Sequence, residues 1–370
     1  MSKPIAENLS VGKGRNSLES QADIRLGEGV DFRRWNEYLL NSPQAHFLQS
    51  IHMVKVFQQI SFRPFLVLAE REGSIVGGLI SYAWFGDSKF PLAKLFSRLY
   101  SYYGPILSSS EIHTSLLEKL LRFVYQINEK NFIMDHQISF IPQMGAHNIL
   151  ETMKYSETAS LRYTFVLDLR ESRQKLWESL EKRCRSAIRR AENEGLRIVH
   201  ESSIEAPKIF HWLHLVTAKR LGIHPDPYSF IDAIWKNLVP SGHAKFYFVY
   251  HKDHPIAGAI ITNFKKKLYY YMSASLKEYR NLYPNNFLQW QIIQDGKNGG
   301  YEFYDFMGSP GKEQKEHPEY GLYLFKRSFG GEMVQIGPSY SKVFSPYAAR
   351  FWESFLVPTF KRVSFISKSL

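Results

Sequence analysis

The feature that most constrains the fold of this chain is a weak internal repeat. Residues 65–80 and 246–261 align without gaps at an offset of 181, and four of the sixteen aligned positions are identical. Each stretch reads as two apolar strands around a polar turn, with Glu72-Gly73 in the first turn and Asp253 in the second. Because 370 residues exceed what one core usually supports, the repeat predicts two domains of the same fold.

The order of predicted elements also repeats. Each half reads helix, helix, antiparallel hairpin, strand, helix, strand, which is the order of an N-acetyltransferase-like (GNAT) domain. The predicted class is therefore α+β, with two tandem GNAT-like domains, each a mixed, mostly antiparallel sheet flanked by helices. We expect a disordered tail over 1–24, a first domain over 25–158 and a second over 159–334. In the first domain the pattern predicts helices at 31–40, 50–60 and 111–129 and strands at 65–71, 74–84, 97–107 and 132–134.

Composition indicates a basic globular protein with an anionic partner. The formal net charge is +12 and the isoelectric point about 9.4, which favours nucleic acid, a phosphorylated substrate or an anionic membrane. The single cysteine, Cys184, excludes an internal disulfide. The polar N-terminus lacks the apolar region of a secretory signal, and no apolar run is long enough to span a bilayer.

Residues 301–331 carry the first candidate site. A short apolar strand holds Asp305 and is interrupted by small residues from Gly308 onward. A helix follows with Leu322, Phe325 and Phe329 on one face, and Lys326 lies beside that face. The ordinary explanation for such a lysine is that its stem covers apolar surface while its ammonium reaches water.

The densest charge lies on a predicted helix that begins near Ser172 and runs, with a break, to Glu194. Five basic residues within nine positions suggest a phosphate-binding stripe, and a solvated helix face is the alternative. Cys184 falls on the apolar face and reads as a core residue. The basic residues are Lys182, Arg183, Arg185, Arg189 and Arg190.

Other chemistries find little support. No nucleophilic triad is visible, and His211 and His214 lack a third ligand at zinc-site spacing, so no metal is predicted. The loop at 275–286, where a coenzyme A-dependent enzyme usually cradles pyrophosphate, contains no glycine. Conventional acetyl-CoA binding is therefore disfavoured, although Lys277 and Arg280 remain able to hold a phosphate.

Several motifs together resemble the Fem family of peptidoglycan-bridge aminoacyltransferases and the wider set of FemAB-like GNAT proteins. The resemblance covers roughly residues 30–345, and the order of the motifs is more specific than any one of them. The motifs are Phe47-Leu48-Gln49-Ser50; Trp177 with Lys182-Arg183-x-Arg185-x-Ala187-Ile188-Arg189-Arg190-Ala191; Pro227-Tyr228-Ser229-Phe230; Ile256-Ala257-Gly258; Tyr279-Arg280-x-Leu282-x-Pro284-Asn285; Tyr304-Asp305-Phe306-x-Gly308; and Gly321-Leu322-Tyr323-x-Phe325-Lys326-x-x-Phe329-Gly330.

The resemblance implies tandem GNAT domains with a cleft, an aminoacyl-tRNA donor and an amine acceptor on a lipid- or nucleotide-linked muropeptide. It also implies that residues 335–370 pack back on the first domain, and that Lys326 stabilises the charge that develops as the amide forms. The chain departs from the family pattern at Met53 and Phe57, where tryptophan and a phosphate-binding lysine are common. It also lacks the helical hairpin that some members use for tRNA.

The leading hypothesis is therefore a cytoplasmic, monomeric N-acyltransferase, at the inner face of the membrane, that moves an aminoacyl group from aminoacyl-tRNA to an amine of an envelope precursor without a cofactor. Lys326 is the expected electrostatic catalyst, and Asp305 is expected to position either the acceptor amine or Lys326. The expected substrate- and phosphate-binding residues are Lys182, Arg185, Arg189, Arg190, Arg280, Tyr283, Asn285, Phe325, Gly308 and Gln49.

Two alternatives remain open at this point. The same fold would also serve an acyltransferase that uses a thioester of coenzyme A or of a carrier protein in envelope polysaccharide synthesis. The second alternative is a non-catalytic module that binds envelope glycans or membranes. Its aromatic and basic residues over 351–365 would form a peripheral anchor. The competing interpretation of that C-terminal segment is packing on the first domain.

Overall fold

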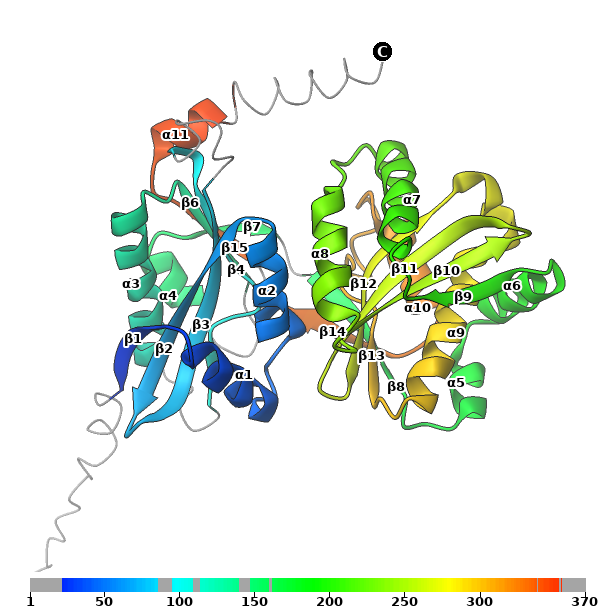
Figure 1. Cartoon of the computed structure of the whole chain (residues 1–370), viewed down its shortest axis with the longest axis horizontal. Helices are drawn as coiled ribbons and strands as arrows, with labels where there is room; N and C mark the ends of the chain where they lie inside the picture. Colours follow the sequence, from blue (N-terminus) through cyan, green and yellow to red (C-terminus); the bar gives the residue numbers. More distant parts are fainter. Residues whose placement is uncertain are drawn as a thin grey trace, which may run out of the picture.

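The computed structural model describes residues 22–85, 95–108, 114–139, 147–159, 162–337, 339–352 and 354. These residues form two mixed, mostly antiparallel sheets with helices against them, one sheet in each half of the molecule (Figure 1). The predicted α+β class is thus confirmed. No helix among the described residues is both long enough and apolar enough to cross a membrane.

The first sheet has the strand order β1-β2-β3-β4-β6-β15-β7, with β5 beside β3. Its strands are β1 (Asp23–Gly27), β2 (Phe62–Arg71), β3 (Ser74–Trp84), β4 (Arg98–Ser101), β5 (Ile106–Leu107), β6 (Asp135–Ser139), β7 (Ser156–Ala159) and β15 (Ser339–Val343). The helices of this half are α1 (Asp31–Asn41), the short 3₁₀ turn η2 (Phe47–Gln49), α2 (Ile51–Gln59), α3 (Thr114–Asn131), α4 (His147–Thr152) and α11 (Pro346–Phe351).

The second sheet has the order β9-β10-β11-β12-β13-β8-β14. Its strands are β8 (Arg162–Asp168), β9 (Arg197–Glu201), β10 (Ala244–His251), β11 (His254–Phe264), β12 (Lys267–Ser275), β13 (Phe303–Asp305) and β14 (Glu332–Ile336). Its helices are α5 (Arg173–Ser179), α6 (Lys182–Asn193), α7 (Ala206–Leu221), α8 (Tyr228–Leu238), the 3₁₀ turn η6 (Lys277–Leu282), α9 (Pro284–Asn298) and α10 (Tyr320–Arg327).

The two sheets share one topology. In each, four consecutive antiparallel strands are followed by a parallel neighbour, β6 beside β4 and β13 beside β12. The hairpins expected from the repeat are present. Each has a bulge near its turn, so that Val76 in β3 and Ile256 in β11 have no partner in the other strand of their hairpin. A Cβ on Gly258 would lie 2.9 Å from the Phe248 ring, so the glycine permits the close approach that the I-x-G pattern predicts.

The last strand of each half is exchanged with the other half. β15 follows the second half in the chain but lies in the first sheet, between β6 and β7. β8 follows the first half but lies in the second sheet, between β13 and β14. Each sheet therefore contains one strand that follows directly, in the chain, an edge strand of the other sheet. The family resemblance predicts that residues 335–370 pack on the first domain. Residues 335–336 instead belong to β14 in the second sheet, whereas residues 339–343 form β15 in the first sheet. Residues 353 and 355–370 lie outside the described part of the chain.

The two halves also share one apolar core. α2 of the first half faces α8 of the second (Figure 1), and Phe57 stacks on Phe230 with ring centroids 6.3 Å apart. Phe47 lies 4.8 Å from the Tyr269 ring and 5.0 Å from the Tyr271 ring. Because these side chains are buried in a single cluster, the halves meet across a packed interface.

Some sequence expectations need correction. The single strand predicted over 97–107 is two strands, β4 and β5, separated by residues 102–105. The strand predicted at 132–134 begins instead at Asp135, and Phe132 is 78% exposed. The tail predicted over 1–24 ends earlier, because β1 begins at Asp23 and pairs with β2. Residues 1–21 lie outside the described part of the chain.

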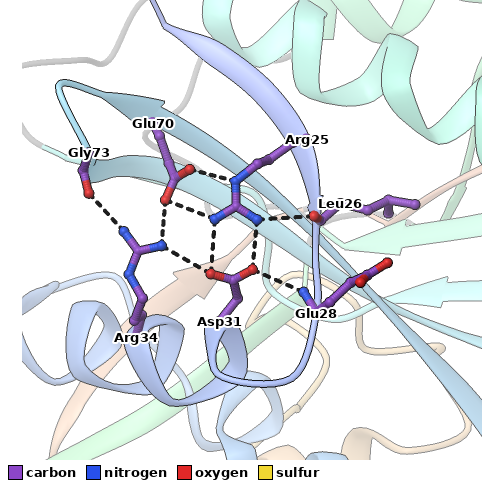
Figure 2. A network of polar contacts seen from close by, with 7 residues as sticks. All are labelled: Arg25, Leu26, Glu28, Asp31, Arg34, Glu70 and Gly73. Atoms are coloured by element: carbon purple, nitrogen blue, oxygen red, sulfur yellow. Dashed lines mark hydrogen bonds and ion pairs between the residues drawn. The ribbon is translucent and has the colours of Figure 1, made fainter.

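A network of ion pairs fastens β1 to the first sheet (Figure 2). The Arg25 guanidinium donates to the carboxylates of both Asp31 on α1 and Glu70 on β2, with shortest distances of 2.6 Å to each. Arg34 bridges the same two carboxylates from α1 and also donates to the Gly73 carbonyl oxygen. These charge-assisted hydrogen bonds hold the pKa of Asp31 and of Glu70 below their usual ranges.

Candidate active site

Lys326 is buried on α10. Its residue is 4% exposed, and its Nζ donates to the carbonyl oxygens of Met307 at 3.1 Å and Gly308 at 2.7 Å. The helix ends at Arg327, and Gly330 follows with φ +79°, close to the end that the sequence predicts. The ordinary explanation, an ammonium in open water, is therefore wrong. Burying an ammonium is costly, and the two carbonyl dipoles compensate for that cost here.

Asp305 has three described polar partners. The Asp305 carboxylate accepts from Thr164 Oγ1 at 2.6 Å and from the Met307 amide at 2.8 Å, and it pairs with Lys267 Nζ at 2.9 Å. Met307 has φ +59°, an uncommon conformation for a residue with a side chain. Asp305 thus holds the Met307 turn, whose carbonyl holds Lys326. This arrangement lets Asp305 support Lys326 through the Met307 turn, and its expected role in positioning the acceptor amine or Lys326 stays a prediction.

Three neighbouring strands build this support: Asp305 lies on β13, Thr164 on β8 and Lys267 on β12. Sequence reasoning missed Thr164 and Lys267, which are 141 and 38 positions away from Asp305. Only the order of strands brings them together, and β8 is the strand exchanged from the other half. No local signal identifies them.

Lys326 opens onto a pocket of about 620 Å³ between the two halves. Tyrosines from both sheets line it, and burial raises the pKa of Tyr102 and Tyr271 above the usual value, so their phenols remain neutral hydrogen-bonding groups. We call this space the tyrosine pocket. Its lining includes Tyr100, Tyr102, Tyr103, Tyr270, Tyr271, Met307, Gly308, Glu319, Leu322 and Lys326.

Two further pockets, of about 940 and 260 Å³, adjoin the other side of α10. They share Tyr283, Asn286 and Phe325, and both lie at the N-terminal end of α9, where Pro284 is the first helical residue. We call them the basic pockets. Their cationic lining residues are Lys182, Arg183 and Arg190 from α6, Lys277 and Arg280 from η6, and Arg220 from α7. Cations and a helix N-terminus together favour an anionic ligand.

The predicted basic stripe divides in the structure. Lys182, Arg183 and Arg190 line the larger basic pocket; Arg183 belonged to the predicted stripe but not to the expected substrate-binding residues. Arg185 instead donates to the carbonyl oxygens of Glu178 and Leu180, at the end of α5. Arg189 stacks over the Trp177 ring at 5.4 Å. Arg185 and Arg189 therefore support α5 and α6, and the structure does not place them among the residues that line either basic pocket.

The remaining predicted residues fall in three places. Arg280, Tyr283, Asn285 and Phe325 line the smaller basic pocket, and Gly308 lines the tyrosine pocket. Gln49 is 1% exposed, and its side-chain amide caps η2 and donates to the Tyr103 carbonyl oxygen at 2.7 Å. Gln49 shapes a loop beside the tyrosine pocket, and the structure does not show it at a ligand surface.

Histidine and cysteine contribute little to this region. His214 Nε2 accepts from the Asp226 amide at 3.0 Å, and within the described ranges no group of three His, Cys, Asp or Glu side chains is arranged to hold a metal ion. Cys184 is buried beside the larger basic pocket, and burial raises the pKa of its thiol. A thiol with a raised pKa is a poor nucleophile at neutral pH.

Solved structures share this two-sheet architecture. The crystal structure of FemX matches with a TM-score of 0.69 at 15% identity, over 90% of this chain and 99% of that chain. A tandem GNAT protein from the clavulanic acid biosynthesis pathway matches with a TM-score of 0.59 at 11% identity, over 87% and 98%. These matches show a tandem GNAT fold.

Sequence comparisons narrow that class. The model of the acetyltransferase (GNAT) domain matches residues 178–320, and the FemAB family model matches residues 124–230. Lipid II:glycine glycyltransferase of Staphylococcus saprophyticus is 24% identical over 46% of this chain and 55% of that protein. The same-named protein of Staphylococcus aureus is 32% identical over 21% of this chain and 20% of that protein. The chain is a FemAB-like tandem GNAT protein, and it spans about half the length of the first of these relatives.

Proposed function

We propose that this protein is an N-acyltransferase of FemAB type, which moves an aminoacyl group from aminoacyl-tRNA to an amine of a lipid- or nucleotide-linked cell-envelope precursor. The observation that carries the proposal is Lys326, a buried ammonium at the boundary between a basic pocket and a tyrosine pocket. The names of the sequence relatives, which are Lipid II:glycine glycyltransferases, support the acceptor class.

α10 would contact both substrates in this mechanism. Phe325 borders both basic pockets, and the next residue, Lys326, borders the tyrosine pocket. The phosphates of the donor's terminal nucleotides would bind the cations of α6 and η6. The neutral tyrosines would hold the acceptor by hydrogen bonds and ring contacts. The two reacting groups would then meet beside Lys326.

The reaction itself is amide formation from an ester. The acceptor nitrogen attacks the ester carbonyl carbon, and the carbonyl oxygen becomes an oxyanion. The oxyanion then collapses to the amide carbonyl as the C–O bond breaks, and the ribose oxygen leaves with the electron pair of that bond and takes up the proton that the nitrogen releases. Lys326 would stabilise the oxyanion as a preorganised charge in a site with little water. Met307 and Gly308 fix the position of its ammonium before the substrates arrive.

Donor binding tests the proposal directly. We expect charged tRNA to bind in calorimetry and to transfer a labelled amino acid to a lipid- or nucleotide-linked muropeptide amine. Acetyl-CoA serves as the comparison, because the loop before α9 contains no glycine to cradle its pyrophosphate. Tight binding of acetyl-CoA, together with no transfer from charged tRNA, would overturn the aminoacyl-tRNA donor.

A thioester donor is the second candidate function. Lys277 and Arg280 lie in the smaller basic pocket beside the N-terminus of α9, a place where phosphate groups of coenzyme A or of a carrier arm would also be stabilised. The same calorimetric comparison decides between the two donors.

A further inference from the structure

The outward face of α7 and the loop after it carry unusually exposed apolar side chains. Trp212 is 48% exposed and Leu215 is 41% exposed, three positions apart on one face of the helix. Leu221 and Ile223 follow at 59% and 54% exposed. We call these four residues the α7 surface. Leu221, nine positions after Trp212, lies at the helix end and does not share the face of Trp212 and Leu215, so the α7 surface comprises the exposed side of the helix, its C-terminal end and the loop after it.

The α7 surface is held rigidly. The opposite face of the helix is buried through Phe210 and Leu213, both 0% exposed. The helix end is tied to β12, because Arg220 donates to the Ser275 carbonyl oxygen at 2.9 Å. Gly222, with φ +68°, ends the helix and turns the chain so that Leu221 and Ile223 both face solvent. A rigid apolar protrusion loses little conformational entropy when it is buried.

Basic residues accompany the apolar ones. Lys219 and Arg220 are exposed beside Leu221, in a chain whose net charge is +12. Two nearby acidic groups are already engaged, since Glu205 pairs with Lys208 and Asp226 lies 3.3 Å from His214. Tryptophan and leucine side chains flanked by lysine and arginine match the interface of an anionic bilayer, where apolar groups enter the acyl boundary and cations meet the headgroups.

We propose that the α7 surface docks the protein on an anionic phospholipid bilayer. Ile223 also lines the tyrosine pocket, so the docked surface would hold that pocket beside the headgroups. In Figure 1 the loop between α7 and α8 lies at the upper side of the molecule, as does α11, where Tyr347 is 90% exposed. One membrane plane along this side would contact both halves. The α7 surface takes no part in aminoacyl transfer, so membrane docking can be tested without donor or acceptor.

The test is co-sedimentation of the full chain with vesicles. We expect binding to phosphatidylcholine vesicles that contain phosphatidylglycerol, weaker binding at high salt, and little binding to pure phosphatidylcholine. The double variant Leu221→Ser/Ile223→Ser should bind the anionic vesicles about tenfold more weakly, because two apolar side chains no longer enter the bilayer. Leu40→Ser is the matched control, since Leu40 is 46% exposed on α1, at the lower side of Figure 1, and its variant should bind like the wild type.

Three outcomes would overturn the inference: no binding of the wild type to anionic vesicles, equal binding of the double variant, or equal binding to neutral vesicles. Matching thermal melting curves of the variants and the wild type show that a loss of binding is not a loss of fold. Self-association of the wild type that the double variant abolishes, without vesicle binding, would assign the surface to a second copy of the chain instead.

Discussion

Lys326 illustrates how burial changes the meaning of a residue. On an exposed helix face, the aliphatic part of the Lys326 side chain would cover apolar neighbours and its ammonium would lie in water. In the structure the ammonium instead donates to the carbonyl oxygens of Met307 and Gly308. An ammonium fixed in this way is a preorganised charge, and water does not need to reorganise around it when an oxyanion forms.

The first prediction concerns Lys326→Met, which keeps the length of the side chain and removes its charge. We expect kcat for aminoacyl transfer to fall by about 10²- to 10³-fold, because the oxyanion loses its stabilising partner. Steady-state kinetics with charged tRNA measure this change. Lys315→Met, on an exposed position of the loop before α10, is the control and should leave kcat unchanged. A Lys326→Met enzyme that folds and keeps kcat within a few-fold of wild type would remove Lys326 from the mechanism.

The second prediction concerns Asp305 as a positioning residue. Asp305→Asn removes the charge opposite Lys267 and weakens the support of the Met307 turn. We expect kcat to fall about tenfold with KM nearly unchanged, and the effects of Asp305→Asn and Lys326→Met to be non-additive because they act on one unit. Multiplicative effects in the double variant would show instead that Asp305 acts independently of Lys326.

The sequence could predict the position of Lys326 but not its surroundings. The spacing of Leu322, Phe325 and Phe329 places the lysine next to an apolar helix face, and Gly330 marks where the helix ends. The partners of Asp305 depend on which strands become neighbours, and no short-range pattern encodes that choice. The same holds for Gln49, whose role in η2 depends on its contact with the Tyr103 backbone.

At the scale of the element, the basic residues of α6 have two different roles, lining a pocket and supporting α5, although the sequence pattern suggested a single phosphate-binding stripe. Arg190 lines the larger basic pocket, whereas Arg185 binds carbonyl oxygens at the end of α5. The third prediction separates them. Arg190→Ala should weaken binding of charged tRNA by about three- to tenfold and reduce the salt dependence of binding by about one ion, because one phosphate contact is lost.

Arg185→Ala is the matched variant for that experiment. It should lower the melting temperature and leave the salt dependence unchanged, because the end of α5 loses its cap but the pocket keeps its cations. Fluorescence titration of charged tRNA at several salt concentrations measures both effects. Equal salt slopes for wild type and Arg190→Ala would exclude Arg190 from phosphate binding.

The ion-pair network of β1 and α1 gives the fourth prediction (Figure 2). Asp31 is 6% exposed and its folded-state pKa is lowered, so its contribution to stability is complete above the unfolded value near 4 and is lost as pH falls. Asp31→Asn should reduce the free energy of unfolding by about 1–2 kcal/mol at pH 7. Urea titrations from pH 7 to pH 3 should show a shallower loss of stability for the variant, and parallel curves would contradict this role.

Local patterns predicted most of the elements, and the exceptions have physical reasons. The hairpins, α1, α2 and the break between α5 and α6 follow from alternation, helical spacing and turn residues. β1 was missed because its five residues, Asp-Ile-Arg-Leu-Gly, are stabilised by the network around Arg25 and by pairing with β2 more than by their own apolar character. The exchanged strand β15 is short and polar, and its place in the first sheet depends on residues about 200 positions earlier.

At the scale of the whole molecule, the strand exchange makes the first sheet depend on the end of the chain. A fragment of residues 1–160 lacks β15, so β6 and β7 are not joined. The fifth prediction is that a fragment of residues 161–370 captures the 1–160 fragment into a soluble complex, because it supplies the missing strand. A fragment of residues 161–336, which lacks β15, is the control and should capture it much more weakly. Co-expression and affinity co-purification measure the difference, and equal capture by both would show that the shared apolar core alone holds the halves together.

The repeat in the sequence anticipated the paired architecture but not the exchange. An offset of 181 between the two hairpins establishes that the halves correspond, and it contains no information on which sheet receives the final strand of each half. Which sheet each final strand joins depends on the folded structure, because each final strand pairs with the strands that lie nearest to it.

The exchange of β8 and β15 also bears on how such a chain could arise. Two copies of a single-domain protein that trade their last strands form a closed dimer with twofold-related subunits, which is a low-cost route to association. Joining the end of one copy to the start of the other keeps every pairing in that dimer, and it yields a chain whose sheets are completed as β15 and β8 complete them here. The consequence for the present molecule is that its two halves are not equivalent, because the buried lysine of α10 comes from the second half and tyrosines of the first half face it across the pocket.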